Sequence, residues 1–62
     1  MATKLNALQM AIRVERENLD RAIRDNEQRI QSLTETSALY AFVYGELTAQ
    51  KGFRETLKRW EA

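Results

Sequence analysis

Apolar residues in the first half of the chain recur at intervals of three and four, the spacing of one face of an α-helix. From Ile12 onward, positions 12, 16, 19, 23, 26, 30 and 33 alternate steps of four and three, which is a coiled-coil heptad. No proline or glycine interrupts residues 3–32, so the pattern predicts one long amphipathic helix over that range. The residues that we predict to line the oligomer seam of this helix are Leu5, Leu8, Ile12, Leu19, Ile23, Asn26, Ile30 and Leu33.

Two positions along this seam, Arg16 and Asn26, are polar. One interpretation of Asn26 is that it pairs with its counterpart in a second chain and fixes the register and number of chains. The other is that it lies at the edge of the seam and faces water. The aliphatic part of Arg16 can lie along apolar surface while its guanidinium reaches solvent. A helix of about 30 residues is roughly 45 Å long, so it needs a second element folded back on it, another chain, or both.

The segment Ser-Leu-Thr-Glu-Thr-Ser at residues 32–37 predicts a break in the helix. Short hydroxyl side chains compete for backbone hydrogen bonds and therefore favour caps and turns over helix interiors. Ser32 and Glu35 have the spacing of a capping box, and Thr34 or Thr36 is an alternative N-cap. A continuous helix is the competing interpretation, because the segment holds neither glycine nor proline. The break predicts a helical hairpin.

A second helix is predicted over residues 35–51 and a short third one over residues 53–61. Gly52 is expected to end the second helix as a C-terminal cap, and Gly45 inside it indicates a kink or the close approach of another backbone. The run from Leu39 to Tyr44 also has high strand propensity, but an isolated strand would have no partner in this chain. The sequence thus predicts an all-α fold, one domain over residues 1–62, with a long N-terminal helix and shorter C-terminal helices.

All five aromatic residues lie in the last 23 positions and leave the second predicted helix apolar over more of its circumference than one neighbour can cover. One hypothesis places them in the core of a dimer of hairpins; another makes them anchors for a different protein, because Tyr and Trp are enriched at binding hot spots. Near the C-terminus, a basic amphipathic segment could rest on an anionic membrane, or Trp60 could close the open end of the hairpin. The predicted partner-binding residues are Tyr40, Phe42, Tyr44, Phe53, Leu57 and Trp60.

The 62-residue chain contains no cysteine and no histidine. A core of this size is marginal, and without disulfides or the usual metal ligands we expect added stability to come from oligomerisation or a partner. No activated nucleophile, phosphate loop or metal-ligand pattern occurs, which predicts a protein that is not an enzyme and has no cofactor or metal. The longest apolar run, residues 38–44, is far short of the roughly 20 residues needed to span a bilayer. We therefore expect a cytoplasmic protein.

These observations predict a small interaction module that self-associates, as a homodimer or larger homo-oligomer, and acts as an adaptor, chaperone or inhibitor of a larger protein. A first alternative is a purely structural assembly part that uses all its apolar surface in self-contact. A second is a nucleic-acid-binding oligomer with Lys4, Arg13, Arg16 and Arg24 aligned in a basic strip, which the net charge of +1 disfavours. The sequence does not decide whether a ligand pocket forms between protomers, how many chains associate or how their helices are oriented.

Overall fold

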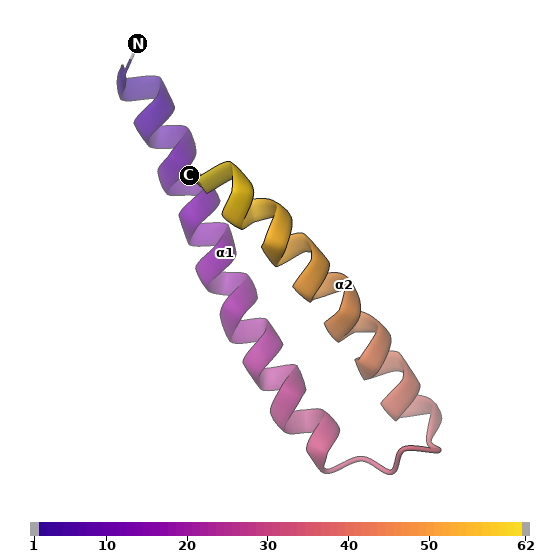
Figure 1. Ribbon diagram of the computed structural model, residues 1–62. Coiled ribbons are helices and arrows are strands. Elements are labelled where there is room, and N and C mark those ends of the chain that lie inside the picture. The colour runs from indigo at the N-terminus through magenta and orange to yellow at the C-terminus, as the bar shows by residue number, and fades with distance from the viewer. Residues whose placement is uncertain (1, 62) are drawn as a thin grey trace.

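The computed structural model of the protein contains two α-helices, α1 (Ala2–Gln31) and α2 (Ala38–Glu61). It describes residues 2–61, with side chains from residue 6 onward. The two helices lie antiparallel and side by side in an elongated hairpin with dimensions of 52 × 15 × 13 Å (Figure 1). The predicted all-α helical hairpin is confirmed, and residues 2–61 contain no strand.

The first helix ends where the hydroxyl-rich segment begins. The backbone N–H of Ser32 donates to the carbonyl of Arg29 at 3.2 Å, and that of Leu33 donates to the carbonyl of Ile30 at 3.1 Å. The Ser32 hydroxyl also donates to the Arg29 carbonyl, at 2.9 Å. These bonds satisfy carbonyls that a helix end would otherwise leave without partners.

The second helix begins with a serine N-cap. The hydroxyl oxygen of Ser37 accepts the backbone N–H of Tyr40 at 3.0 Å, which is the N-cap arrangement. The cap is therefore the last hydroxyl residue of the segment rather than Ser32, Thr34 or Thr36, and α2 begins at Ala38 instead of residue 35. Several residues of the segment can cap in principle, and the packing of α2 on α1 selects among them.

The predicted division of α2 at Gly52 is wrong, because α2 continues without interruption to Glu61. No described glycine has a positive φ, so Gly52 does not adopt the left-handed conformation of a C-terminal cap. An interior glycine costs about 1 kcal/mol relative to alanine, and the burial of Leu57 one turn further on compensates for that cost. Gly45 is also helical, and apart from chain neighbours and the backbone of the same helix no atom lies within 4 Å of the position its Cβ would take.

The core is a single seam between the two helices. Ile23 of α1 and Val43 of α2 are almost completely buried, at 1% and 0% exposure, and Leu47 completes their cluster. Leu57 is buried nearer the C-terminal end of α2. Most side chains of α2 that are buried or that bond to α1 again alternate steps of three and four, and we call this series the inner stripe: Tyr40, Val43, Leu47, Gln50, Arg54, Leu57 and Glu61. Glu46 and Lys51, which also bond to α1, lie on either side of it.

From Arg16 to Leu33, the predicted seam of α1 therefore lies against α2 of the same chain. Leu8, which was also predicted to line the seam, is exposed. Leu19, Ile30 and Leu33 pack around the core cluster. The side chain of Leu5 lies outside the described residues. Because Glu61 contacts Arg13 and Arg16, the part of α1 before these residues projects past the end of α2 (Figure 1). Exposed apolar side chains in this projection include Leu8 and Met10.

Candidate functional site

Asn26, a polar residue of the seam, is buried at the contact between the helices. Its side chain is 8% exposed and donates to Glu46 Oε1 at 2.6 Å and to Gln50 Oε1 at 3.0 Å. Asn26 thus has its hydrogen-bond partners within its own chain, on α2, and it does not face water. Gln50 belongs to the inner stripe, so a polar residue of one helix meets a polar residue of the other. This match satisfies a buried amide that would otherwise be costly to desolvate.

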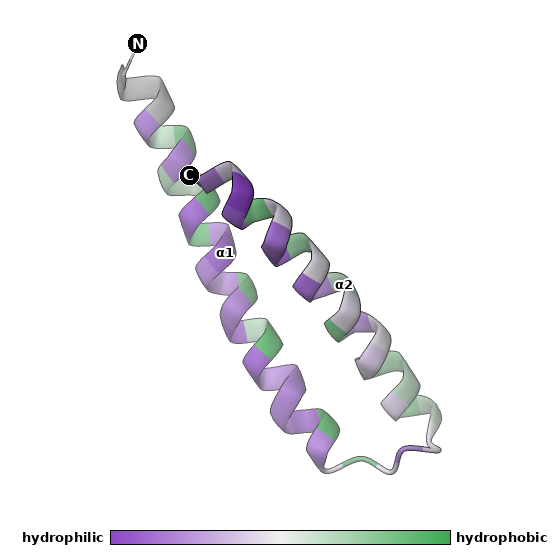
Figure 2. Ribbon diagram, viewed as in Figure 1, coloured by the Kyte–Doolittle hydropathy of each residue, from purple (hydrophilic) through white to green (hydrophobic). Residues whose placement is uncertain are grey.

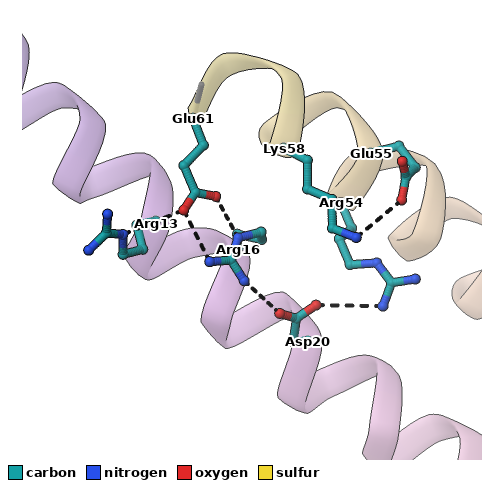
Figure 3. A network of polar contacts seen from close by, with 7 residues as sticks. All are labelled: Arg13, Arg16, Asp20, Arg54, Glu55, Lys58 and Glu61. Carbon is teal, nitrogen blue, oxygen red and sulfur yellow. Dashed lines mark hydrogen bonds and ion pairs between the residues drawn. The ribbon is translucent and has the colours of Figure 1, made fainter.

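Arg16, the other polar seam residue, forms a two-point pair with Glu61 (Figure 3). Its Nε donates to Glu61 Oε2 at 2.5 Å and its Nη2 donates to Glu61 Oε1 at 3.1 Å. Its remaining Nη1 donates to Asp20 Oδ2 at 2.9 Å. Two parallel bonds between a guanidinium and a carboxylate add geometric specificity as well as energy. The guanidinium of Arg16 therefore binds α2 instead of reaching freely into solvent.

Further ion pairs extend this network on the same flank of the hairpin. Arg54 Nη1 lies 3.5 Å from Asp20 Oδ1, and Arg13 Nε lies 3.5 Å from Glu61 Oε1 (Figure 3). Hydrogen bonds from Arg16 lower the pKa of Glu61, and the same bonds raise the pKa of Arg16. Both shifts favour the ionised forms, so the pair remains charged at neutral pH. These ion pairs therefore hold the C-terminal end of α2 against α1.

A second series of side chains on α2 is left mostly uncovered by α1, which reaches it through the hydrogen bond from Asn26 to Glu46. Each member directly precedes a position of the inner stripe and therefore lies about 100° around the helix axis from it. We call the series the outer stripe: Leu39, Phe42, Glu46, Ala49, Phe53, Thr56 and Trp60. Its large apolar members Leu39, Phe42, Phe53 and Trp60 are 45%, 63%, 50% and 61% exposed. Figure 2 shows hydrophobic residues gathered in the part of α2 nearest the connection.

The predicted partner-binding residues are distributed over three surroundings. Leu57 is buried in the hairpin core, and Tyr40 is half-buried in the inner stripe with its ring stacked on that of Tyr44, 6.2 Å between centroids. Tyr44 is 59% exposed and follows an inner-stripe residue, so it lies on the opposite flank of α2. The other three predicted residues share the outer stripe: Phe42, Phe53 and Trp60.

Sequence reasoning missed four members of the outer stripe: Leu39, Glu46, Ala49 and Thr56. The sequence indicates these positions by a second series spaced three and four residues apart, which lies one residue before the inner stripe. Trp60 does not close the open end of the hairpin, because it is 61% exposed on a continuous helix.

Several basic residues, including Arg13 and Arg16 of the predicted nucleic-acid strip, are paired within the chain. Arg13 and Arg16 contact Glu61, Arg54 contacts Asp20, and Lys51 Nζ lies 3.6 Å from Glu27 Oε2. The side chain of Lys4 lies outside the described residues. Within the described part of the chain, neither helix is both long and apolar enough to cross a membrane.

The described residues offer little for small-molecule or metal chemistry. No group of three or more acidic side chains among them could hold a metal ion. A shallow surface depression on α1 is lined entirely by charged side chains, namely Glu17, Asp20, Arg21 and Arg24. Ligand pockets are typically concave and mostly apolar, so this depression does not have the character of one. The outer stripe is the candidate functional surface.

Comparison of the chain with models of protein families, with curated proteins and with solved structures finds no match. The functional argument therefore depends on the surface chemistry of the hairpin.

Proposed function

We propose that this protein is a non-enzymatic protein–protein interaction module that binds other protein chains through the outer stripe of α2. The observation that carries this proposal is the exposure of three aromatic rings and a leucine along one flank of a single helix. Soluble monomers seldom expose contiguous apolar patches larger than a few hundred Å² without a binding role. Aromatic side chains are also the type most often found to dominate binding energy.

The small internal core supports the same proposal. The buried apolar side chains among the described residues are Ile23, Val43, Leu47 and Leu57. Small domains of this kind usually depend on a disulfide, a metal or association for part of their stability, and the chain contains no cysteine. Covering the outer stripe would add a second layer of apolar burial beside the first.

The mode of action that fits this surface is occupation of a partner's apolar groove or helix face. A helix with apolar anchors at intervals of three, four and seven residues is a common recognition element. The seam of α1 packs on α2 of the same chain and is not free to bind a second chain. In this proposal, both self-association and the binding of a larger protein therefore use the outer stripe. An adaptor, chaperone or inhibitor would act by covering its target in this way.

The test is a matched pair of lysine substitutions on α2. Phe42 and Tyr44 are exposed to similar extents, 63% and 59%, but lie on opposite flanks of the helix. Phe42→Lys should abolish both self-association, measured by light scattering, and stoichiometric co-purification of a partner from the native host. Tyr44→Lys should leave both intact, and circular dichroism should show the same helix content in the two variants.

Two results would contradict the proposal. Loss of binding in both variants to the same degree would show that association does not depend on the outer stripe. A chain that stays monomeric at high concentration, with no co-purified partner and no effect of Phe42→Lys, would show that the exposed rings have no binding role. Self-association without any foreign partner would favour the purely structural assembly part.

A further inference from the structure

Helix α2 carries two adjacent stripes, of which α1 covers only one. The inner stripe packs on α1, whereas the large apolar side chains of the outer stripe, one residue earlier at every step, remain exposed. In the outer stripe, Glu46 bonds to Asn26 of α1. A helix inside a four-helix bundle contacts two neighbouring helices, and its apolar positions widen accordingly from one seam to two. The apolar face of α2 is therefore wide enough to contact two helices, as in a four-helix bundle, but in the single chain it contacts only α1.

We infer that the occupant of the outer stripe is a second copy of this chain, with the two α2 helices packed antiparallel about Ala49 to form a four-helix bundle. This inference rests on the proposed function, because it uses the same surface and names the partner. It is supported by the extent of the stripe, by the order of its side chains and by the distribution of charge along α2.

The extent of the stripe suits a dimer interface. From residue 39 to residue 60 it runs about 32 Å along the helix at 1.5 Å per residue. A fully covered aromatic side chain buries about 150–250 Å², so rings that are 50–63% exposed leave roughly 300–400 Å² uncovered per chain. Two copies supply about 600–800 Å² from their rings alone, against the roughly 1,200–2,000 Å² of a standard interface. Leu39, Ala49 and the surface between the rings add to this area.

The order of side chains along the stripe is self-complementary when it is reversed. A two-fold axis at Ala49 sets the smallest residue of the stripe against itself and allows the helices to approach closely. The same operation sets Phe42 opposite Thr56 of the second copy and brings Leu39 beside Trp60. It also brings Phe53 beside the aliphatic part of Glu46, whose carboxylate is bonded to Asn26 of its own chain. A two-fold interface requires such self-complementarity, because the same patch serves both subunits.

The charge distribution also favours the antiparallel arrangement. Residues 38–50 of α2 carry a single ionised side chain, Glu46, and a net charge of −1. Residues 51–61 carry four basic and two acidic side chains, a net charge of +2. Antiparallel packing sets the acidic half of one α2 beside the basic half of the other, whereas parallel packing would set the two +2 segments together. Antiparallel packing also opposes the two helix dipoles.

A charge exchange at Ala49 tests the inference. In solution-mass measurements, the unmodified chain should be a dimer. Ala49→Glu and Ala49→Lys should each weaken dimerisation by at least about tenfold, because like charges would meet at the two-fold axis. An equimolar mixture of the two variants should dimerise again as the mixed species. Gln28→Glu, on an exposed position of α1, is the matched control and should remain a dimer.

Disulfide formation gives a second measurement with a clean background, because the chain has no cysteine. Ala49→Cys should link to itself on mild oxidation, whereas Thr56→Cys, in the outer stripe but opposite Phe42 in the antiparallel pair, and Gln28→Cys on α1 should not. Self-linking of Thr56→Cys would mean parallel packing, in which every residue of the outer stripe meets its own counterpart, and would overturn the inference.

The remaining outcomes separate this inference from the proposed function. A dimer that persists in both Ala49 variants overturns the arrangement, while self-association itself stands. A monomer that still loses a co-purified protein on Phe42→Lys overturns the second copy as occupant and leaves the interaction module intact. A monomer that binds anionic vesicles through Phe42 assigns the stripe to lipid, and both proposals then fail.

Discussion

The side chains of Arg16 and Glu61, 45 positions apart in the sequence, are joined by two hydrogen bonds of 2.5 and 3.1 Å. This pair holds the last turn of α2 against α1, and Asn26 with Gln50 makes a second polar contact nearer the connection. A slip of one heptad would set Asn26 opposite Val43 or Leu57, where its amide would lose its partners. The two contacts therefore specify the register of the hairpin, a role well attested for polar residues in helical seams.

The stability of the hairpin should fall as the pH is lowered through the acid range, in part because of Glu61. Arg16 lowers the pKa of Glu61 in the folded state, so protonation of this carboxylate favours the unfolded chain. The stabilisation is present above the ordinary Glu pKa of about 4.3 and is lost as the pH falls through the lower, folded-state value. Urea denaturation measured from neutral to acid pH should show this loss, and Glu61→Gln should flatten the curve.

The control for this measurement is Glu55→Gln. Glu55 pairs with Lys58 of its own helix, at 3.6 Å, and makes no described ion pair with α1. An equal flattening of the curve by both substitutions would mean that the pair between Arg16 and Glu61 contributes nothing specific.

Removing Asn26 should reveal coupling between the two helices. Asn26→Leu leaves Gln50 and Glu46 without their donor, and we expect a loss of about 0.5–1.5 kcal/mol in the free energy of unfolding. Adding Gln50→Leu replaces the half-buried acceptor by an apolar group, while the exposed Glu46 can bond to water, and most of that loss should be recovered. A double-mutant cycle by chemical denaturation measures the coupling. Additive effects would show that the hydrogen bond has no energetic role.

Truncation of Leu47 should be among the most damaging single changes to the fold. Leu47 is 6% exposed and belongs to the central core cluster. Leu47→Ala should cost about 2–5 kcal/mol through lost burial and a residual cavity. Leu8→Ala is the matched control: this leucine is 59% exposed in the projecting part of α1, and its truncation should change the melting temperature little. Equal effects would place the core elsewhere.

Replacing either glycine of α2 with alanine should stabilise the hairpin. Neither Gly45 nor Gly52 has a positive φ, and apart from chain neighbours and the backbone of the same helix no atom lies within 4 Å of an added Cβ at either position. Alanine should therefore gain about 0.5–1 kcal/mol per site by restricting the unfolded chain. Thermal denaturation of dilute protein measures this, and the reverse change Ala49→Gly should lose a similar amount. Destabilisation by Gly45→Ala would reveal a close neighbour at this site.

The cap of α2 should be sensitive at one serine and not at the neighbouring threonine. Ser37→Ala removes the acceptor of the Tyr40 N–H and should cost about 0.5–2 kcal/mol. Thr36→Ala, at an exposed turn position, should be close to neutral. The two melting temperatures give the answer directly, and a larger effect at Thr36 would contradict the assignment of Ser37 as the cap.

Local features of the fold could be predicted from the sequence because helix formation depends on neighbouring residues. The uninterrupted heptad of α1 and the hydroxyl-rich break were both visible, and the hairpin follows from them. The end of α2 was mispredicted, because Gly52 has the local character of a helix stop. The stop is overridden by contacts beyond it, in which Leu57 and Glu61 pack on α1.

The sequence by itself determined that this protein is helical, that α1 has a heptad face and that aromatic residues gather on α2. Each of these properties depends on periodicity and composition within one segment. Only the tertiary structure decided that the α1 seam faces α2 of the same chain and that Phe42, Phe53 and Trp60 remain uncovered together. The physical reason is that these outcomes depend on the register and rotation of one helix against the other. Contacts between residues far apart in the sequence, such as Arg16 with Glu61 and Asn26 with Gln50, set both.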